Sequence, residues 1–198
     1  MKQKKRIGAR IIAVVGVLTA VAVVLQYLEI SIPLVPSFLK LDFSDLPALL
    51  GAYAFGPLAG VLIQLLKNLI HLAVSQSGFV GELSNFLLGA VFVLVAGLIY
   101  QRKKTKMRAL IAGLVGAAAM ALVSVPVNYF IVYPLYYSVL GFPEQAVLDM
   151  YQAILPSVGS IFESLLIFNL PFTLVKGLIS VFISMLIYKP LSRLFKGE

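Results

Sequence analysis

Apolar runs too long for the core of a small soluble domain occupy most of this chain. They cover approximately residues 9–28, 44–74, 82–100, 109–134 and 158–188. Hydrophobic residues make up 61% of the 198 residues and charged residues only 12%, whereas soluble domains carry about 25% charged residues. Continuous runs of this kind predict membrane helices rather than the alternating strands of a barrel. We therefore expect an all-α integral membrane protein, with residues 1–198 forming a single membrane domain.

The Lys and Arg residues cluster at the ends of the apolar runs. Of 16 in total, five lie in MKQKKRIGAR (1–10), five in QRKKTKMR (101–108) and three after Tyr188. Such clusters follow the positive-inside rule, so both termini and the 101–108 loop are expected on the cytoplasmic side. Because the net charge of +8 is explained in this way, nucleic acid is not an expected partner.

The run 44–74 must cross the membrane twice if all three basic clusters lie on one side. Pro57 marks the break, because proline disfavours a helical conformation in the preceding residue and suits the first position of a new helix. Ser44 is the expected N-cap of the first, short helix. Six spans follow, with both termini cytoplasmic: 9–28, 44–55, 57–74, 82–100, 109–134 and 158–188.

The expected external segment 29–43 is apolar although Pro33 and Pro36 prevent a regular helix. Irregular backbone at membrane depth needs protein or a cavity around it, so this segment is expected to fold back against the bundle. Two interpretations stay open, a lid over a binding site and an inert ordered loop.

Polar residues inside the apolar runs share helix faces. One face of the third span carries Gln64, Lys67, Asn68 and His71, and one face of the sixth carries Asn169, Thr173, Lys176 and Ser180. In the expected topology these groups, like Glu82, Asn85 and Asn128, lie toward the outside. This asymmetry predicts a polar cavity open to the exterior rather than a pore, although simple helix-to-helix hydrogen bonding is the alternative. The aromatic residues expected to wall the cavity around a flat ligand are Tyr53, Phe55, Phe79, Phe86, Tyr129, Phe168 and Phe172.

Small residues form a stripe along the first span. Ala9, Ala13, Gly16 and Ala20 follow helical spacing, and such stripes allow another helix to approach closely. The partner is either a helix of this chain or another subunit. The small residues at 116–119 in the fifth span are a competing candidate for internal packing.

Catalytic motifs are missing from the sequence. The chain has no phosphate-binding G-x-x-x-x-G-K-[ST] loop, no H-E-x-x-H motif and no cysteine. We therefore expect neither an enzyme nor a metal or cofactor site, and an uphill carrier of this kind would need energy from elsewhere. A channel is disfavoured because the polar groups stop halfway across the expected bundle.

Several blocks of the sequence resemble one transporter family. LKLDFSDLPALLGAYAFGPLAGVLIQLLKNLIHL, GELSNFLLGA, VNYFIVYPLY and NLPFTLVKGL are similar to the riboflavin-specific substrate-binding (S) component of energy-coupling factor transporters. The resemblance implies the six-helix S-component fold in a prokaryotic plasma membrane. It also implies that riboflavin is bound from outside, and that the partners are a transmembrane coupling subunit and two cytoplasmic ATPases. An S component for another vitamin, or for the flavin nucleotides FMN and FAD, is the alternative.

The resemblance also implies roles for individual residues. Asn128 and Lys176 would contact the flavin ring, Leu39, Lys40 and Leu41 would cover it, and Gly81 and Asn85 would line the ribityl side. Either Thr173 or Asn169 would make a further flavin contact. Tyr129 belongs to the same expected site, and Lys67 and Asn68 are additional candidates. The stripe that includes Ala13, Gly16 and Ala20 would bind the coupling subunit.

Overall fold

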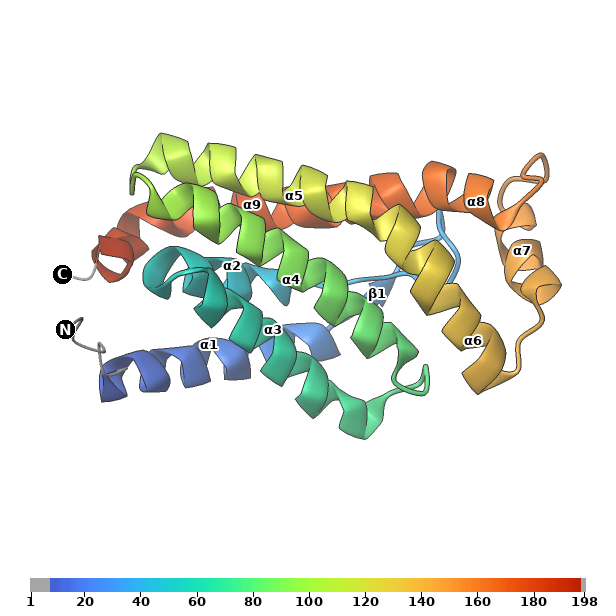
Figure 1. Cartoon of the computed structure of the whole chain (residues 1–198), viewed down its shortest axis with the longest axis horizontal. Coiled ribbons are helices and arrows are strands. Elements are labelled where there is room, and N and C mark those ends of the chain that lie inside the picture. Colours follow the sequence, from blue (N-terminus) through green and yellow to red (C-terminus); the bar gives the residue numbers. More distant parts are fainter. Residues whose placement is uncertain (1–7, 197–198) are drawn as a thin grey trace, which may run out of the picture.

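The structure, a computed structural model, describes residues 8–196 as a long helical bundle (Figure 1). Its helices are α1 (Ala9–Tyr27), α2 (Asp45–Phe55), α3 (Pro57–His71), α4 (Val80–Gln101), α5 (Lys106–Val127), α6 (Tyr133–Leu140), α7 (Glu144–Gln152), α8 (Ile161–Ser164) and α9 (Leu170–Lys196). Leu72–Val74 (η1) forms a 3₁₀ turn, and Asn128–Val132 (η2) and Leu165–Asn169 (η3) are π-helical. Two short strands, β1 (Ile30–Ser31) and β2 (Lys40–Leu41), complete the fold.

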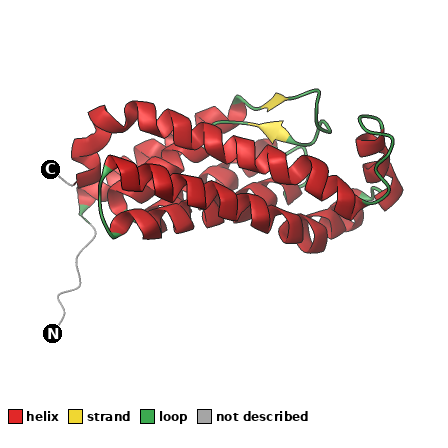
Figure 2. Ribbon diagram, turned by 90° about the horizontal axis from the view of Figure 1, so that it is seen from above, coloured by secondary structure: helices red, strands yellow, loops and turns green. Residues whose placement is uncertain are grey.

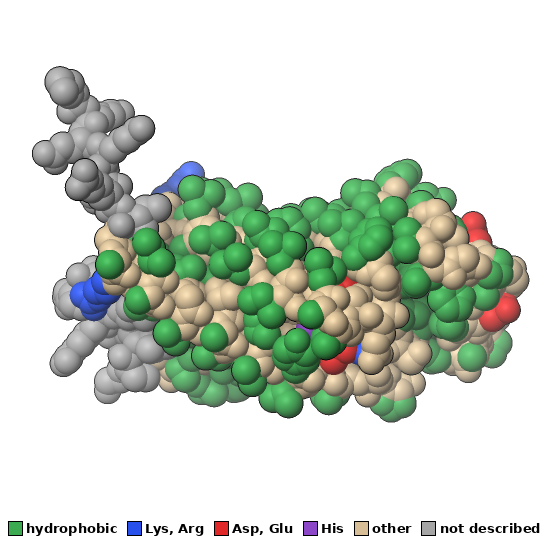
Figure 3. Space-filling view, turned by 90° about the horizontal axis from the view of Figure 1, so that it is seen from below, with side chains coloured by type: hydrophobic (Ala, Val, Ile, Leu, Met, Phe, Trp, Pro, Cys, Tyr) green, Lys and Arg blue, Asp and Glu red, His purple; other side chains and the backbone are tan. Residues whose placement is uncertain are grey.

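The long helices run along the bundle and leave the two ends chemically different. The start of α1, the α4–α5 turn and the last turns of α9 lie at one end, whereas α6, α7 and α8 lie at the other (Figure 1). Basic side chains mark the first end and acidic side chains the opposite end (Figure 3). The start of α1, the α4–α5 turn and the last turns of α9 therefore share one end, as the parity argument expects, although residues 1–7 and the side chains after Tyr188 lie outside the described residues.

Among the described residues, five helical segments are long and apolar enough to cross a membrane. They cover Ala9–Tyr27, Pro57–Val74, Val80–Gln101, Lys106–Leu140 and Ile161–Tyr188. The segment Lys106–Leu140 extends past the expected end at residue 134, because the helix continues through η2 into α6. Helix α2 has only 11 residues, about 16 Å at 1.5 Å per residue, so it is too short to span a bilayer by itself.

The expected break between α2 and α3 is confirmed. Gly56 has φ of 103°, a conformation that glycine adopts readily, and Pro57 occupies the first turn of α3. Ser44 occupies the N-cap position of α2 as expected, but its side chain makes no capping bond to the helix. Its hydroxyl instead donates to Asp42 Oδ1, which draws Ser44 into a buried polar cluster.

The segment 29–43 folds back on the bundle as expected. Ile30 pairs with Leu41 and Ser31 with Lys40 in an antiparallel ribbon that lies along one side of the helices (Figure 2). At the turn, the Phe38 ring lies 5.8 Å from the Tyr151 ring and 6.3 Å from the Tyr133 ring, both in edge-to-face contact. These aromatic contacts anchor the segment to the end of the bundle that carries α6 and α7.

Glycine allows α3 to pack closely against α2 and α4. A Cβ at Gly60 would lie 2.7 Å from Ala52 Cβ, 2.9 Å from the Ala48 carbonyl oxygen and 3.0 Å from Val93 Cβ. Gly16 of α1, in contrast, has no such neighbour within 4 Å. The helices meet at Gly60 with no room for a methyl group.

We expect Gly60→Ala to lower the free energy of unfolding by about 1–3 kcal/mol, because the added methyl group overpacks the contact. The matched variant Gly16→Ala should be neutral or stabilising by about 0.5–1 kcal/mol, the usual gain from alanine in a helix. Thermal unfolding of both purified variants, followed by circular dichroism at 222 nm, measures the difference. Equal melting temperatures would contradict the close packing at Gly60.

Candidate functional site

A cavity of about 620 Å³ lies between the helices beside the segment 29–43, within the range typical of small-molecule sites. Its walls come from α1, the 29–43 segment, the start of α2, α3, α4, α5 with η2, α6, α7 and α9. Acidic, basic and histidine side chains show through the mainly apolar surface at one place on the lower face (Figure 3). The cavity is therefore the polar hollow that the helix-face patterns predicted.

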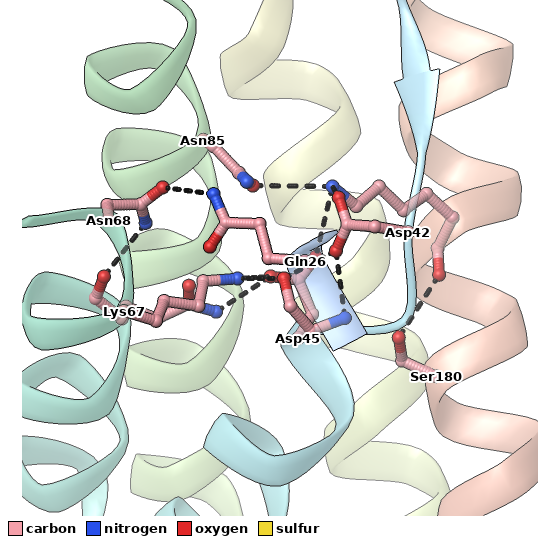
Figure 4. A network of polar contacts seen from close by, with 10 residues as sticks. Gln26, Asp42, Asp45, Lys67, Asn68, Asn85 and Ser180 are labelled. Carbon is pink, nitrogen blue, oxygen red and sulfur yellow. Dashed lines mark hydrogen bonds and ion pairs between the residues drawn. The ribbon is translucent and has the colours of Figure 1, made fainter. Parts of the chain in front are cut away.

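Two buried ion pairs lie at the inner wall of the cavity, one with Lys176 on the wall itself and one with Lys67 behind it (Figure 4). Lys176 Nζ of α9 lies 2.8 Å from Asp42 Oδ2 and 3.8 Å from Asp45 Oδ2. Lys67 Nζ of α3 lies 2.9 Å from Asp45 Oδ1 and donates to Ser44 Oγ. The stretch from Asp42 to Asp45 thereby links α3 to α9.

Each charge in this cluster is stabilised by opposite charge. Lys67 has no exposed surface and Asp45 is 1% exposed, so either group alone would carry a large desolvation cost. Burial would raise the pKa of Asp42, but the ammonium groups of Lys176 and Lys67 outweigh it and hold that pKa below its ordinary value. Asp42 is therefore ionised at neutral pH.

Amide side chains extend the cluster to α1 and α4. Gln64 Nε2 donates to Asp45 Oδ1 at 2.8 Å, and Lys176 Nζ donates to Asn85 Oδ1 at 3.3 Å. Gln26 Nε2 of α1 donates to Asn68 Oδ1 at 3.0 Å (Figure 4). Polar side chains of α1, α3, α4 and α9 are thus connected around the cavity wall.

A second polar group lies where α3 ends and α4 begins. His71 Nδ1 is 2.9 Å from Glu82 Oε1, and the Tyr27 ring lies 5.3 Å from the His71 ring. Ser75 and Ser77 donate their hydroxyls to Glu82 Oε2 at 2.7 and 3.1 Å. Glu82 is 6% exposed and lines the cavity, so its carboxylate is held firmly in position.

A tyrosine–asparagine group occupies the end of the cavity near α7. Tyr151 donates to Asn169 Oδ1 at 2.6 Å, and Asn169 Nδ2 donates to the Tyr133 hydroxyl at 3.1 Å. Burial raises the pKa of Tyr151, so its hydroxyl is a neutral donor. Asn169 closes the π-helical η3, and Asn128 opens the π-helical η2, a distortion that often accompanies functional sites.

The structure brings most of the expected site residues to the cavity. Its lining includes Leu39, Lys40, Gly81, Asn85, Asn128, Asn169, Thr173 and Lys176. Four others are not part of the lining: Leu41, Lys67, Asn68 and Tyr129. Lys67 and Asn68 support it from behind through Asp45 and Gln26. Tyr129 is 41% exposed and packs against Phe162.

The expected aromatic wall is mostly wrong. Of the seven rings proposed from sequence, only Phe172 lines the cavity, which is instead walled by Tyr27, Phe38, Tyr133, Tyr136 and Phe142. Gln26, Glu29, Asp42 and Asp45 also line it and were not expected. The two intramembrane lysines need counter-ions, and this need is a signal that points to Asp42 and Asp45. The signal is usable only if α2 is expected to enter the bundle.

The stripe of small residues on α1 faces away from the rest of the described chain. Ala9, Ala13, Gly16 and Ala20 are all exposed, whereas α1 packs inward through Val15, Thr19, Ala22 and Gln26. In α5, Gly116 and Ala117 are buried, and a Cβ at Gly116 would lie 2.8 Å from the Phe92 carbonyl oxygen. Internal packing therefore uses the small residues of α5, and the α1 stripe is left for something outside the described chain.

Comparison with known proteins places the chain among membrane transport components. The family described as "ECF transporter, substrate-specific component" matches residues 10–188. The riboflavin transporter RibU of Staphylococcus aureus is 35% identical over 99% of this chain and 95% of its own length. The riboflavin transporter FmnP of Bacillus subtilis is 29% identical over 95% of this chain and 92% of its own. A solved S component of a bacterial ECF transporter superposes with a TM-score of 0.74 and 31% identity, covering 94% of this chain and 98% of that one.

Proposed function

The chain belongs to the family of ECF transporter substrate-specific components, and on this premise we propose that it binds riboflavin from outside the cell for uptake. The observation that carries the proposal is the cavity, where planar rings, amide groups and two lysines converge from separate helices and the 29–43 segment. As a member of this family, the chain is a transport subunit and not an enzyme.

Riboflavin matches the chemistry of the cavity. Its flat ring system is apolar on both faces and carries an imide N–H and two carbonyl oxygens along one edge, and its ribityl chain carries hydroxyls. Tyrosine and phenylalanine rings suit the faces, and Lys176, Asn128 and Asn85 can donate to the carbonyls or hydroxyls. The names of the relatives favour riboflavin over another vitamin.

Two of the expected contacts differ in their freedom to bind a ligand. Asn169 already bonds Tyr133 and Tyr151, whereas no hydrogen bond within the described residues engages the Thr173 side chain. We therefore assign the additional flavin contact to Thr173, with Asn169 holding the two tyrosines that support Phe38. The segment 29–43, which contributes Leu39 and Lys40 to the cavity wall, acts as the cover over the bound ring.

We further propose six membrane-crossing segments within a single membrane domain in the cell membrane, with both termini in the cytoplasm. Helix α2 would cross only part of the bilayer. Because α3, α4 and α9 pack around it, these neighbours surround a helix that is shorter than the bilayer is thick. The partners are then a transmembrane coupling subunit at the exposed Ala13–Gly16–Ala20 stripe and two cytoplasmic ATPases.

Binding of riboflavin by the purified protein tests this function. The detergent-solubilised, ligand-free protein should quench added riboflavin fluorescence in a saturable titration. Lys176→Ala and Asn128→Ala should each weaken binding by about 1–3 kcal/mol through lost buried hydrogen bonds. That loss corresponds to a Kd about 5 to 150 times higher.

Lys106→Ala is the matched control, because this exposed lysine lies far from the cavity lining; its Kd should equal that of the wild type. A protein that does not quench riboflavin fluorescence would overturn the function. Wild-type affinity in both the Lys176 and Asn128 variants would remove these two residues from the site.

A further inference from the structure

A second hollow lies between α5 and α9, away from the cavity described above. Its volume is about 650 Å³, and it shares no lining residue with that cavity. Leu110 and Leu114 of α5 and Leu178 and Phe182 of α9 belong to its lining, which is apolar except for Lys106. We call this hollow the α5–α9 groove.

Glycine brings α5 and α9 together and leaves the groove beside their line of contact. The two helices run side by side along the bundle (Figure 1). A Cβ at Gly113 would lie 2.8 Å from Val181 Cγ2, and a Cβ at Gly177 would lie 2.8 Å from Ala117 Cβ. Val181 is buried at the floor of the groove, whereas Phe182 is 65% exposed at its edge. The groove is therefore open to whatever surrounds the bundle.

The position of the groove gives it the depth of one membrane leaflet. Both helices belong to segments that are long and apolar enough to cross a membrane. The lining of α5 extends from Lys106 to Leu114, about 12 Å along the helix at 1.5 Å per residue. One leaflet contributes about 15 Å of hydrocarbon, half of a core of about 30 Å. The groove thus extends from the basic end of the bundle across most of one leaflet.

Positive charge gathers where the groove begins. Lys106 belongs to the basic cluster of the α4–α5 turn, together with Arg102, Lys103, Lys104 and Arg108. Neither α5 nor α9 contains an aspartate or a glutamate, and no carboxylate of the described residues forms an ion pair with Lys106. An occupant with an apolar body and an anionic end would therefore complement the groove.

The side chains of the groove suit a flexible occupant better than a helix. Helices that associate in membranes need small residues at their contact, such as those of the α1 stripe. The groove is lined instead by leucine, phenylalanine and methionine side chains. Met107 and Met185 are two of the five methionines in the chain, and methionine adapts its shape to irregular partners. An acyl chain fits such a lining.

We propose that the α5–α9 groove binds one anionic phospholipid, with an acyl chain along the groove and the phosphate at Lys106. Basic pockets between membrane helices bind anionic lipid head groups in this way, and a lysine ammonium donates charge-assisted hydrogen bonds to a phosphate. In the topology proposed above, the lipid belongs to the cytoplasmic leaflet. This site is separate from the riboflavin function, and either can fail without the other.

Tryptophan fluorescence in lipid vesicles tests the proposal, because the chain contains no tryptophan. Phe182→Trp places a single reporter at the groove. The purified full chain is reconstituted in dioleoylphosphatidylcholine, and brominated phosphatidylcholine or brominated phosphatidylglycerol then replaces a rising share of the lipid. Bromine quenches tryptophan on contact, so the two titrations give the affinity of the anionic lipid relative to the zwitterionic one. This ratio should be at least about fivefold at the groove.

Lys106→Ala in the reporter chain should lower the ratio by at least about threefold, because one basic side chain beside the phosphate is lost. Lys103→Ala is the charge-matched control. Lys103 is exposed in the same basic cluster but does not line the groove. At about 0.15 M salt, where exposed charges are screened beyond about 8 Å, this variant should leave the ratio unchanged.

A second reporter separates the groove from general attraction to the basic end. Leu58 is exposed on α3 at that end, since the nearby Gly56 lies against Gln101 beside the α4–α5 turn. Leu58→Trp should give a ratio closer to one, and Lys106→Ala should not change it. Circular dichroism melting of every variant verifies folding. In detergent without phospholipid, Lys106→Ala should keep the wild-type riboflavin Kd, so its effect in vesicles is an effect on the lipid.

The outcomes that would overturn the proposal are distinct. A ratio near one at the Phe182→Trp reporter would show that the groove does not select anionic lipid. If that variant also lost riboflavin uptake in cells, the groove would belong to a protein partner. A raised ratio that Lys106→Ala leaves unchanged, or that the Leu58→Trp reporter shows equally, would indicate diffuse attraction by the basic end and no lipid site.

Discussion

Replacing Lys67 with methionine should lower the free energy of unfolding by about 3–5 kcal/mol, the usual cost of leaving one partner of a buried ion pair alone. Lys67 is fully buried and pairs with Asp45, which is 1% exposed. Methionine fills nearly the same space, so the loss is electrostatic rather than a cavity effect. For a chain of this length, the melting temperature should fall by about 6–20 °C, measured by circular dichroism in detergent.

Two comparisons separate the ion pair from a general effect of removing lysine. Lys106→Met, at an exposed position of α5, should have the same melting temperature as the wild type. The double variant Lys67→Met with Asp45→Asn removes both charges and should recover more than half of the lost stability. A single Lys67→Met variant that melts within about 2 °C of the wild type, less than about 1 kcal/mol, would show that Asp45 does not depend on Lys67.

Replacing Gly16 with leucine should abolish riboflavin uptake by cells while leaving riboflavin binding unchanged. Gly16 is exposed, and nothing lies within 4 Å of the position of its Cβ, so leucine is accommodated in the isolated chain. The same side chain would separate α1 from a closely packed helix of the proposed coupling subunit, since such contacts require small residues. Uptake of labelled riboflavin into cells that express the complete transporter, together with Kd in detergent, measures both properties.

Ala118→Leu provides the matched control for added bulk at an exposed small residue of another helix, α5, and should support normal uptake. Gly16→Ala, which keeps the stripe small, should do so as well. Normal uptake by Gly16→Leu would reject α1 as the docking face. Loss of riboflavin binding in that variant would instead indicate a structural role for Gly16.

The helix pattern of this protein was readable because it depends on local chemistry. Apolar run length set the long helices, Pro57 set the break after Gly56, and the spacing of Lys67 and Lys176 identified inward-facing sides. The hydroxyl of Ser44 was misassigned, because a capping interpretation considers only the next few residues. Its partners are Asp42, in the preceding segment, and Lys67, 23 residues away.

The site was predicted less completely than the helices. Polar residues with helical spacing, such as Asn169 and Thr173, were identified correctly as cavity residues, since a buried polar face needs a polar environment. The aromatic wall was not predicted correctly. Aromatic residues on membrane helices face lipid as readily as protein, and no local pattern distinguishes the two. Phe38 reaches the cavity only because its loop folds onto Tyr133 and Tyr151.

Local sequence thus defines the helices, the basic end of the bundle and the inward-facing amides and lysines, because hydrophobic transfer and helix geometry act over a few residues. Local sequence does not define the counter-ions of those lysines. Asp42 and Lys176 are 134 positions apart, and nothing in either neighbourhood indicates the other. They meet because the short α2 inserts between α3, α4 and α9 and carries Asp45, with the preceding Asp42, into the bundle, where each buried charge requires an opposite one.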